Sequence, residues 1–509
     1  MAQIMIEVKP ECQELVEAFV RLLRQVQTRV TAAATDGAAV DYGQVEQDLA
    51  QATAALEREA HAVVLSALDV DAQKLMVDGQ AYRPVLRGPG DYYTMAGPVV
   101  VQRTLYRKVG ERNGPTVDAI SLRAGVVGDG WLPRTAATMA WECQRAPSRE
   151  AEQASVKWQR LPYSRSAFES VAHLLGEQYA KRREVVERAL VENMIVPMQA
   201  HSISVSLDRV CIPMEEPRPM VKPEGEAIAV EPGETEAVKE PACESAELHK
   251  KKKPKRPIQR VFRQAYAATV TLHDKEGDSL CTLRYGRMPQ GDIDGLCTGL
   301  CDDVLVRLKR YPGLLVVLLC DGAKELWNRL GAEFTQETLG RPVYRLVDLW
   351  HLLEKLGTAT RLLYGEKEGA SVLCRWRLKL LNDDTALEHI LQTLKDSGKE
   401  QVRVGDNRPV HEAITYLENH REDMKYAQAR RLGLPVGSGN VEAACKSLYE
   451  VRLKRPGCRW KETTGAHIVD LRSLGLSDRY DEAVTRALAP LRHSVSPGPG
   501  SSTVLSCAG

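Results

Sequence analysis

Three acidic residues of this 509-residue chain have the type and placement to do chemistry together. Asp208 lies within a segment that alternates apolar and polar residues, Asp321 directly follows an apolar run, and Glu442 lies in the first turn of an expected helix. Mg²⁺ prefers oxygen ligands, and two such ions can activate the attacking oxygen and stabilise the leaving oxygen at a phosphodiester. If the fold brings these carboxylates together, they predict a metal-dependent enzyme acting on DNA or RNA.

A basic segment follows Glu442 and ends in a tryptophan. Its cationic side chains can neutralise phosphates, and an indole can stack on an unpaired base. The alternative for Trp460 is a contact in the protein core or at a helix cap. The residues expected to bind DNA here are Arg452, Lys454, Arg455, Arg459 and Trp460.

The overall composition restricts the class of protein. The formal net charge is +1, with 69 basic and 68 acidic residues, so the total charge neither requires nor excludes nucleic acid. The twelve cysteines show no repeated short spacing, and Cys297 and Cys301 lack the second ligand pair of a zinc site. The longest apolar run, Leu314–Cys320, is too short to span a bilayer. We therefore expect an intracellular protein without a membrane segment.

The elements around the acids predict an α/β fold with a mixed sheet. Residues 202–213 alternate, which places Asp208 on the face opposite Ile203, Val205 and Leu207. Strands are expected again at 260–273, 279–285, 314–320 and 343–347, with helices at 292–310, after Asp321 and at 349–364.

This order of elements is that of an RNase H-like fold. Such a sheet places the fourth strand beside the first, and ligand sites of open α/β sheets form at strand ends. Asp208 and Asp321 are therefore expected to lie together, and a helix across the sheet edge could deliver Glu442.

The remainder of the chain divides into regions around this core. Residues 1–96 are expected to be helical, with helices at 11–35 and 43–68. Residues 97–195 are expected to hold a strand and a helix-turn-helix-like DNA-binding region. The other predicted regions are the first part of the core (196–364), with a disordered acidic and then basic insertion at 214–259, an all-helical insertion (365–433), the final core helix (434–477), and a C-terminal helix with a flexible tail (478–509).

In the helix-turn-helix-like region, three short helices are expected at 134–145, 148–160 and 164–190. Modules of this kind push the N-terminus of one helix into a groove of DNA. Ser164, Arg165 and Ser166 would occupy that position. The alternative is an ordinary helical domain.

Four segments resemble successive motifs of bacterial insertion-sequence DDE transposases of the ISKra type: SVSLDRVCIPM, VVLLCDGAKELWN, LVDLWHLLEKL and GSGNVEAACKSLYEVRLKRPGCRW. The resemblance covers about residues 130–475. It implies an RNase H-like core with a helical insertion before the last acid, and it implies that Asp208, Asp321 and Glu442 are the catalytic residues and hold two Mg²⁺ ions, for which Mn²⁺ can substitute. Arg209 departs from the glycine that related sequences often carry after the first acid, and the insertion at 214–259 is a second departure.

The expected function is that of a transposase. It would bind double-stranded DNA at terminal inverted repeats, cleave there, and join the freed 3′-OH to target DNA. We also expect a homo-oligomer, dimeric or larger, and a cytoplasmic, nucleoid-associated location. The alternatives are a catalytically inactive DNA-binding protein derived from a transposase, or an RNase H-fold nuclease that only cuts.

Asp348 and His351 follow the last expected strand of the core. Asp348 could cap the next helix, and His351 is a secondary catalytic candidate that could orient a phosphate or the leaving oxygen.

Overall fold

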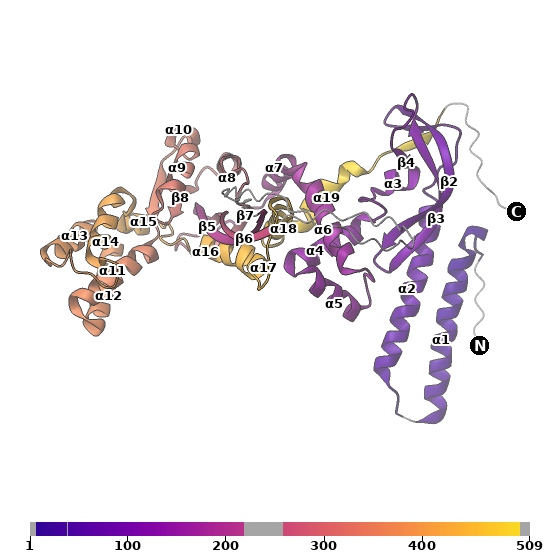
Figure 1. Ribbon diagram of the computed structural model, residues 1–509, viewed down its shortest axis with the longest axis horizontal. Coiled ribbons are helices and arrows are strands. Elements are labelled where there is room, and N and C mark those ends of the chain that lie inside the picture. The colour runs from indigo at the N-terminus through magenta and orange to yellow at the C-terminus, as the bar shows by residue number, and fades with distance from the viewer. Residues whose placement is uncertain (1–6, 38, 218–257, 499–509) are drawn as a thin grey trace, which may run out of the picture.

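The computed structural model describes residues 7–37, 39–217 and 258–498. It is a mixed α/β structure with two five-stranded sheets and many helices. A helical hairpin projects at one end of the elongated molecule, and a group of helices forms the other end (Figure 1).

The sheet that carries Asp208 and Asp321 has the strand order β7-β6-β5-β8-β9. Strands β5, β6 and β7 are antiparallel neighbours, whereas β8 pairs with β5 and β9 pairs with β8 in parallel. The continuous apolar sequence of β8 is explained by burial on both faces. The strands are β5 (Ser202–Pro217), β6 (Ile258–His273), β7 (Ser279–Arg287), β8 (Leu315–Cys320) and β9 (Val343–Val347).

The two faces of this sheet lie in different hydrophobic cores. Ile203, Val205 and Leu207 of β5 belong to the first core, and Ile212 and Met214 belong to the second, as the alternation of a strand requires. The first core contains the helices within residues 365–433 and the four helices before them, α8 (Ile293–Arg310), α9 (Lys324–Glu333), α10 (Gln336–Leu339) and α11 (Leu349–Tyr364).

The second core contains residues of the sheet, helices that precede the sheet in the sequence and helices that follow it. It combines α4, α6 and α7 with α16 (Gly439–Cys445), α18 and α19. The segment predicted to be helix-turn-helix-like packs against α18, which in turn contacts the sheet. The predicted third helix is interrupted, since α6 ends at Ala180 and α7 begins at Arg183. The elements are α3 (Ala119–Ala124), α4 (Pro133–Arg145), α5 (Ser148–Trp158), α6 (Arg165–Ala180), α7 (Arg183–Asn193), α18 (Glu462–Gly475) and α19 (Tyr480–Leu488).

A second sheet contains strands in two regions where none were predicted. Residues 75–94, expected within a helical region, form strands, and residues 495–497 of the predicted flexible tail pair with β1. The long strand β2 contains Pro84, Pro89 and two glycines, so it lacks a clear alternation, and it depends on pairing with β3 over nearly its whole length. The strands are β1 (Leu75–Val77), β2 (Gln80–Thr94), β3 (Gly97–Lys108), β4 (Thr116–Asp118) and β10 (Val495–Pro497).

The insertion at 214–259 is shorter than predicted, because residues 214–217 belong to β5 and residues 258–259 belong to β6. The rest of it, 218–257, lies outside the described residues, as do residues 499–509 of the tail.

Residues 365–433 are helical and form the end of the molecule opposite the hairpin (Figure 1). These helices are α12 (Glu366–Asn382), α13 (Ala386–Asp396), α14 (Pro409–Asn419), a 3₁₀ turn at Arg421–Asp423 and α15 (Tyr426–Arg431).

The segment that follows the insertion does not form one regular helix. Helix α16 (Gly439–Cys445) continues into a π-helical turn at Lys446–Glu450 and a short α17 (Val451–Leu453). Such turns widen a helix locally and are frequent at functional sites.

No helix within 7–37, 39–217 or 258–498 is long and apolar enough to cross a bilayer.

Candidate active site

Asp208 and Asp321 lie on neighbouring strands at the same level of the sheet. Val205 of β5 pairs with Leu318 of β8, and each aspartate lies three residues further along its own strand direction. Continuing the parallel register therefore aligns Asp208 with Asp321, and adjacent strands are about 4.8 Å apart. The structure thus brings two of the three predicted acids together.

The Asp208 carboxylate is partly buried between the sheet and α16. The Cys445 thiol donates to its Oδ2 at 3.5 Å, and the Arg209 backbone N–H donates to its Oδ1 at 2.7 Å. Burial raises the pKa of the Asp208 carboxyl, and the Asp321 carboxylate adds to the rise. The two hydrogen bonds and the His351 imidazole act in the opposite direction. Asp208 is therefore a carboxylate whose negative charge is costly unless a cation is near.

Asp321 lies where the helical insertion contacts the sheet. Its Oδ1 accepts from the Ala323 backbone N–H at 2.9 Å. Next to it, a Cβ at Gly322 would lie 2.5 Å from Tyr416 Cε2 and 2.9 Å from His420 Nε2, so only glycine permits this approach. Tyr416 and His420, in α14 and directly after it, therefore border the strand end that carries Asp321. No sequence pattern around Tyr416 or His420 indicated this.

The Tyr416 hydroxyl faces this acidic neighbourhood. It is buried, and the Gly322 backbone N–H lies close enough to it to lower its pKa. Burial raises the pKa of Tyr416, and the carboxylates of Asp321 and Asp348 raise it further. The hydroxyl is therefore protonated and available as a donor beside the two acids.

Asp348 ties the start of one helix to the start of another. It is 3% exposed, and its Oδ1 accepts from the backbone N–H groups of Trp350 at 2.6 Å and His351 at 3.2 Å, which confirms the cap interpretation. Its Oδ2 accepts from the backbone N–H of Ser438 and from the Ser438 hydroxyl at 2.5 Å. Asp348 thereby fixes the turn from which α16 and Glu442 begin.

Glu442 lies in the first turn of α16 but does not join the aspartates. Its side chain is 59% exposed and forms an ion pair with Lys446 at 2.7 Å. Glu442 precedes Cys445 by about one helical turn, and Cys445 contacts Asp208. Among residues 7–37, 39–217 and 258–498, no three His, Cys, Asp or Glu side chains are grouped closely enough to hold a metal ion.

His351 is exposed at the start of α11. Its Nδ1 lies 3.7 Å from Glu354 Oε2, and the imidazole is close enough to lower the pKa of Asp208. It is thus near the aspartates and accessible to a substrate.

Arg452 is buried, contrary to the expectation that it binds DNA. It is 5% exposed, its Nε donates to the Cys143 carbonyl at 3.0 Å, and its guanidinium lies 5.0 Å from the centroid of the Trp460 ring. Burial also lowers the pKa of Arg452. The side chain joins α17 to α4 and does not face a phosphate.

Trp460 has the structural contacts of the alternative interpretation. Its indole N–H donates to the Leu453 carbonyl at 3.1 Å. Its backbone pairs with the end of β5, donating to the Pro213 carbonyl at 3.1 Å and accepting from the Glu215 N–H at 2.8 Å. Trp460 therefore anchors the basic loop to the sheet.

The remaining cations of this loop are at the surface and are paired with acids. Lys454 lies 2.7 Å from Glu450, Arg459 lies 3.2 Å from Glu215, and Arg455 is bound to Glu150 of α5. Exposed pairs of this kind are weak, about 0 to 1 kcal/mol, so a polyanion can compete for the cations.

Ser164, Arg165 and Ser166 are exposed at the N-terminus of α6. The Ser164 hydroxyl accepts from the Ala167 N–H at 3.4 Å, so it caps the helix. The Arg165 backbone N–H donates to Glu152 at 2.9 Å. Their side chains are accessible, and no contact brings them to the aspartates.

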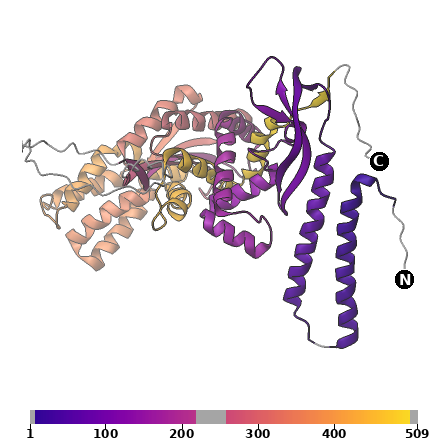
Figure 2. The same cartoon turned by 45° about the vertical axis from the view of Figure 1, so that its right-hand side comes forward.

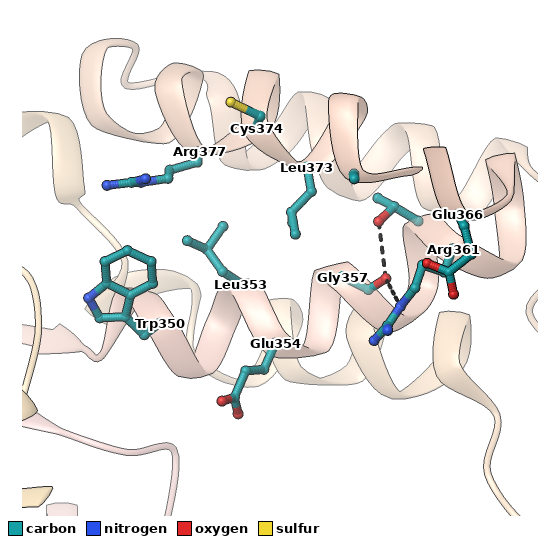
Figure 3. A pocket seen from close by; sticks show the side chains of 11 residues that line it. Trp350, Leu353, Glu354, Gly357, Arg361, Glu366, Leu373, Cys374 and Arg377 are labelled. Atoms are coloured by element: carbon teal, nitrogen blue, oxygen red, sulfur yellow. Dashed lines mark hydrogen bonds between the residues drawn. The ribbon is translucent and has the colours of Figure 1, made fainter. Parts of the chain in front are cut away.

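A cavity of about 530 Å³ lies between α11 and α12 (Figure 3). Trp350, two residues after Asp348, lies at one end of the cavity and is 54% exposed. The Arg377 guanidinium lies 4.7 Å from the centroid of the Trp350 ring. Leu353 and Leu373 form the apolar wall between the helices. An exposed indole beside a cation is a surface on which a base can stack. No sequence pattern indicated a binding role for Trp350.

Replacing Asp208 by Asn is expected to stabilise the metal-free protein at neutral pH. Because the pKa of Asp208 is raised on folding, the folded state disfavours the ionised form, and this destabilisation grows as the pH rises through that pKa. The variant should melt roughly 1 to 3 °C higher at pH 7.5. The gain should vanish below about pH 4, where the native carboxyl is protonated in both states.

Thermal unfolding in the presence of a chelator, measured between pH 4 and pH 8, tests this expectation. Asp294→Asn is the control, since the Asp294 side chain is 82% exposed. A lower melting temperature for Asp208→Asn at neutral pH would contradict the inference that burial and the Asp321 carboxylate disfavour the ionised form of Asp208.

No family model and no curated protein matches the chain. A solved structure described as a Drosophila P element transposase strand transfer complex is similar to it with a TM-score of 0.34 and 11% sequence identity, over 69% of this chain and 93% of that one.

Proposed function

We propose that this chain is a DDE-type DNA transposase with an RNase H-like core. The observation that carries the proposal is the parallel pairing of β5 with β8, whose register, continued by three residues, aligns Asp208 with Asp321. The strand order β7-β6-β5-β8-β9 also supports it, because an RNase H-like sheet has its fourth strand beside its first.

The donor set at the strand ends fits a divalent cation. Burial raises the pKa of Asp208 and the Asp321 carboxylate raises it further, so the two groups are hard oxygen ligands in need of a positive charge. Asp208 and Asp321 would hold the ions, with Glu442 as the third ligand. When bound, Mg²⁺ or Mn²⁺ would lower the pKa of a water molecule and offset the charge at the scissile phosphate.

The surrounding residues supply positioning. Asp348 holds the turn at Ser438, so α16 begins at a fixed point beside the sheet. The hydrogen bond from Cys445 to Asp208 holds α16 against β5, and Glu442 lies about one helical turn before Cys445. The Tyr416 hydroxyl and the accessible imidazole of His351 are donors that can orient a phosphate or the leaving oxygen.

DNA is the partner that the surface charges favour. Lys454, Arg455 and Arg459 would exchange their exposed acidic partners for phosphates, and the same role is proposed for Ser164, Arg165 and Ser166 on α6. The duplex would carry terminal inverted repeats, and the cleaved end would be joined to target DNA.

The test is an assay of cleavage and strand joining with Mg²⁺ on DNA that carries the ends of the genomic segment encoding the chain. Glu442→Gln should reduce cleavage on the order of 100-fold, as expected when a metal ligand is lost. Glu450→Gln is the matched control, because Glu450 pairs with Lys454 four residues on as Glu442 pairs with Lys446.

The outcomes separate the candidate functions. Cleavage followed by joining supports a transposase, and cleavage without joining supports a nuclease. Binding of the ends without cleavage supports an inactive DNA-binding protein. Cleavage that survives Glu442→Gln would remove Glu442 from the site.

A further inference from the structure

Helix α4 (Pro133–Arg145) has one face in the second core and another toward solvent. In both views α4 and α5 lie between the hairpin of α1 (Gln13–Asp36) and α2 (Tyr42–Ser66) and the sheet that carries Asp208 (Figures 1 and 2). The solvent face carries four side chains at a spacing of four, three and four residues, which keeps them on one side of the helix. They are Arg134, Thr138, Trp141 and Arg145.

A cavity of about 590 Å³ lies between this face and α19. Arg134 borders the cavity from α4, and Arg492, four residues after the end of α19, borders it as well. Trp141 packs edge-on against Tyr480 of α19, with the ring centroids 4.9 Å apart, and both rings line the cavity. Asp481 is the acidic side chain of the lining. Guanidinium groups from two separate segments thus border one cavity.

The cations of this surface differ from those of the loop after Glu442, because they have no acidic partner. Lys454, Arg455 and Arg459 of that loop are each paired with a glutamate. The Arg145 guanidinium lies 5.8 Å from the centroid of the Trp141 ring, a contact that restricts the side chain without neutralising its charge. An incoming phosphate therefore has no carboxylate to displace. The exposed arginines here that form no ion pair in the described part of the chain are Arg134, Arg145, Arg492 and, at the start of α5, Arg149.

The C-terminal end of α4 contacts two buried arginines, Arg452 and Arg472. Arg472 of α18 is 6% exposed, and its Nη1 donates to the Gln144 carbonyl at 2.8 Å. Burial lowers the pKa of Arg472 to about 10, and three nearby guanidinium groups lower it further. These belong to Arg452, Arg145 and Arg455. The four positive charges repel one another, and an anion bound beside Arg145 would relieve that repulsion.

We propose that the solvent face of α4, with Arg149 and Arg492 beside it, binds the phosphate backbone of duplex DNA. This inference rests on the proposed function, from which it takes DNA as the partner, and it places the duplex on α4 and not at the start of α6. Arg134 and Arg145 are eleven residues apart, or about 16 Å along the helix, which spans roughly five phosphates of one strand. Each guanidinium group can bind two oxygens of a phosphate.

The first test measures binding of the full chain to a fluorescently labelled duplex of arbitrary sequence, by anisotropy at about 50 to 200 mM salt. Arg134→Gln combined with Arg145→Gln should weaken binding to unrelated duplexes equally. The slope of log K against log salt should fall by about 1.8, or about 0.9 for each lost phosphate contact. Arg188→Gln combined with Lys309→Gln is the matched control, since both side chains are exposed on helices and have no acidic partner in the described part of the chain.

The outcomes separate this surface from the proposed function. If the native chain binds duplex DNA and the Arg134→Gln, Arg145→Gln chain keeps its affinity and salt slope, the role of α4 is overturned and the proposed function stands. If the native chain binds no duplex, both are overturned. Thermal unfolding should give the same melting temperature for the double variant and its control, so that a loss of binding is not a loss of folding.

The second test locates the duplex by photo-crosslinking. The full chain with benzoylphenylalanine in place of Thr138 should cross-link to duplex DNA, whereas the same substitution at Arg188 should not. Benzoylphenylalanine in place of Ser166 examines the start of α6. Cross-linking from position 166 without cross-linking from position 138 would overturn the proposal.

Discussion

Asparagine at position 208 or 321 is expected to abolish metal-dependent DNA cleavage, with a loss of at least about 100-fold. Even groups that only support a metal ligand typically contribute about 10- to 100-fold to affinity or activity, and these two carboxylates are the proposed ligands themselves. Each substitution keeps the side-chain volume but removes the charge, and Asp208 and Asp321 are aligned on adjacent strands. Single-turnover cleavage measured over a range of Mg²⁺ concentrations gives the loss.

The controls separate lost chemistry from lost folding. Asp294→Asn should cleave at the native rate, because Asp294 is exposed in α8 and pairs with Arg329 away from the strand ends. Asp208→Asn should be inactive while its melting temperature is unchanged or higher. If Asp208→Asn and Asp321→Asn both cleave normally, the metal site is not at this edge of the sheet.

Replacing Arg479 by Met is expected to have the largest effect on stability. Arg479 is 8% exposed at the start of α19, with Nη1 3.2 Å from Glu187 Oε2 of α7 and the guanidinium 5.2 Å from the Tyr285 ring centroid. Tyr285 in turn donates to Asp303 of α8. Methionine fills the space but leaves Glu187 without its compensating charge and removes one of the two cations near Asp303, the other being Arg307. An uncompensated buried charge typically costs about 3 to 5 kcal/mol in the free energy of unfolding.

Chemical denaturation of the two proteins measures this loss. Burial raises the pKa of Asp303 to about 6, so the deficit of Arg479→Met should shrink as the pH falls below about 6 and this carboxyl becomes neutral. Arg486→Met is the control, since Arg486 pairs with Glu482 on the exposed side of the same helix and should lose about 0 to 1 kcal/mol. Equal losses for the two variants would contradict the buried role of Arg479.

The central sheet could be predicted because its signals are local. The alternation around Asp208 and the apolar run before Asp321 mark strands directly, and the parallel register then aligns the two acids. The strand β2 could not be predicted in this way. Pro84 and Pro89 interrupt its pattern, and its pairing with β3 and the pairing of β1 with β10 exist only in the folded chain.

The basic loop after Glu442 shows where residue type misleads. Arg452 and Trp460 have the composition of a DNA-binding surface, but Arg452 donates to Cys143 about 300 residues away in sequence and Trp460 pairs with the end of β5. Tyr416 and His420 were missed for the converse reason. Their approach to Gly322 depends on how the helical insertion docks, which no short pattern encodes.

Glu442 lies in the first turn of a helix, as predicted, but its carboxylate does not lie beside the two aspartates. Its helix begins at the turn held by Asp348, yet its carboxylate is paired with Lys446 at the surface. An ion pair at this exposure is weak enough for a stronger cation to replace it. The proposed role of Glu442 therefore depends on whether the aspartates bind a metal at all.

Titration of the DNA-free protein with Mn²⁺, followed by the electron paramagnetic resonance signal of the free ion, tests that central claim directly. The native chain should bind Mn²⁺, and Asp208→Asn or Asp321→Asn should weaken binding by at least about 10- to 100-fold, while Asp294→Asn should leave it unchanged. Equal Mn²⁺ affinity in the native chain and in both strand-end variants would contradict a metal site formed by Asp208 and Asp321.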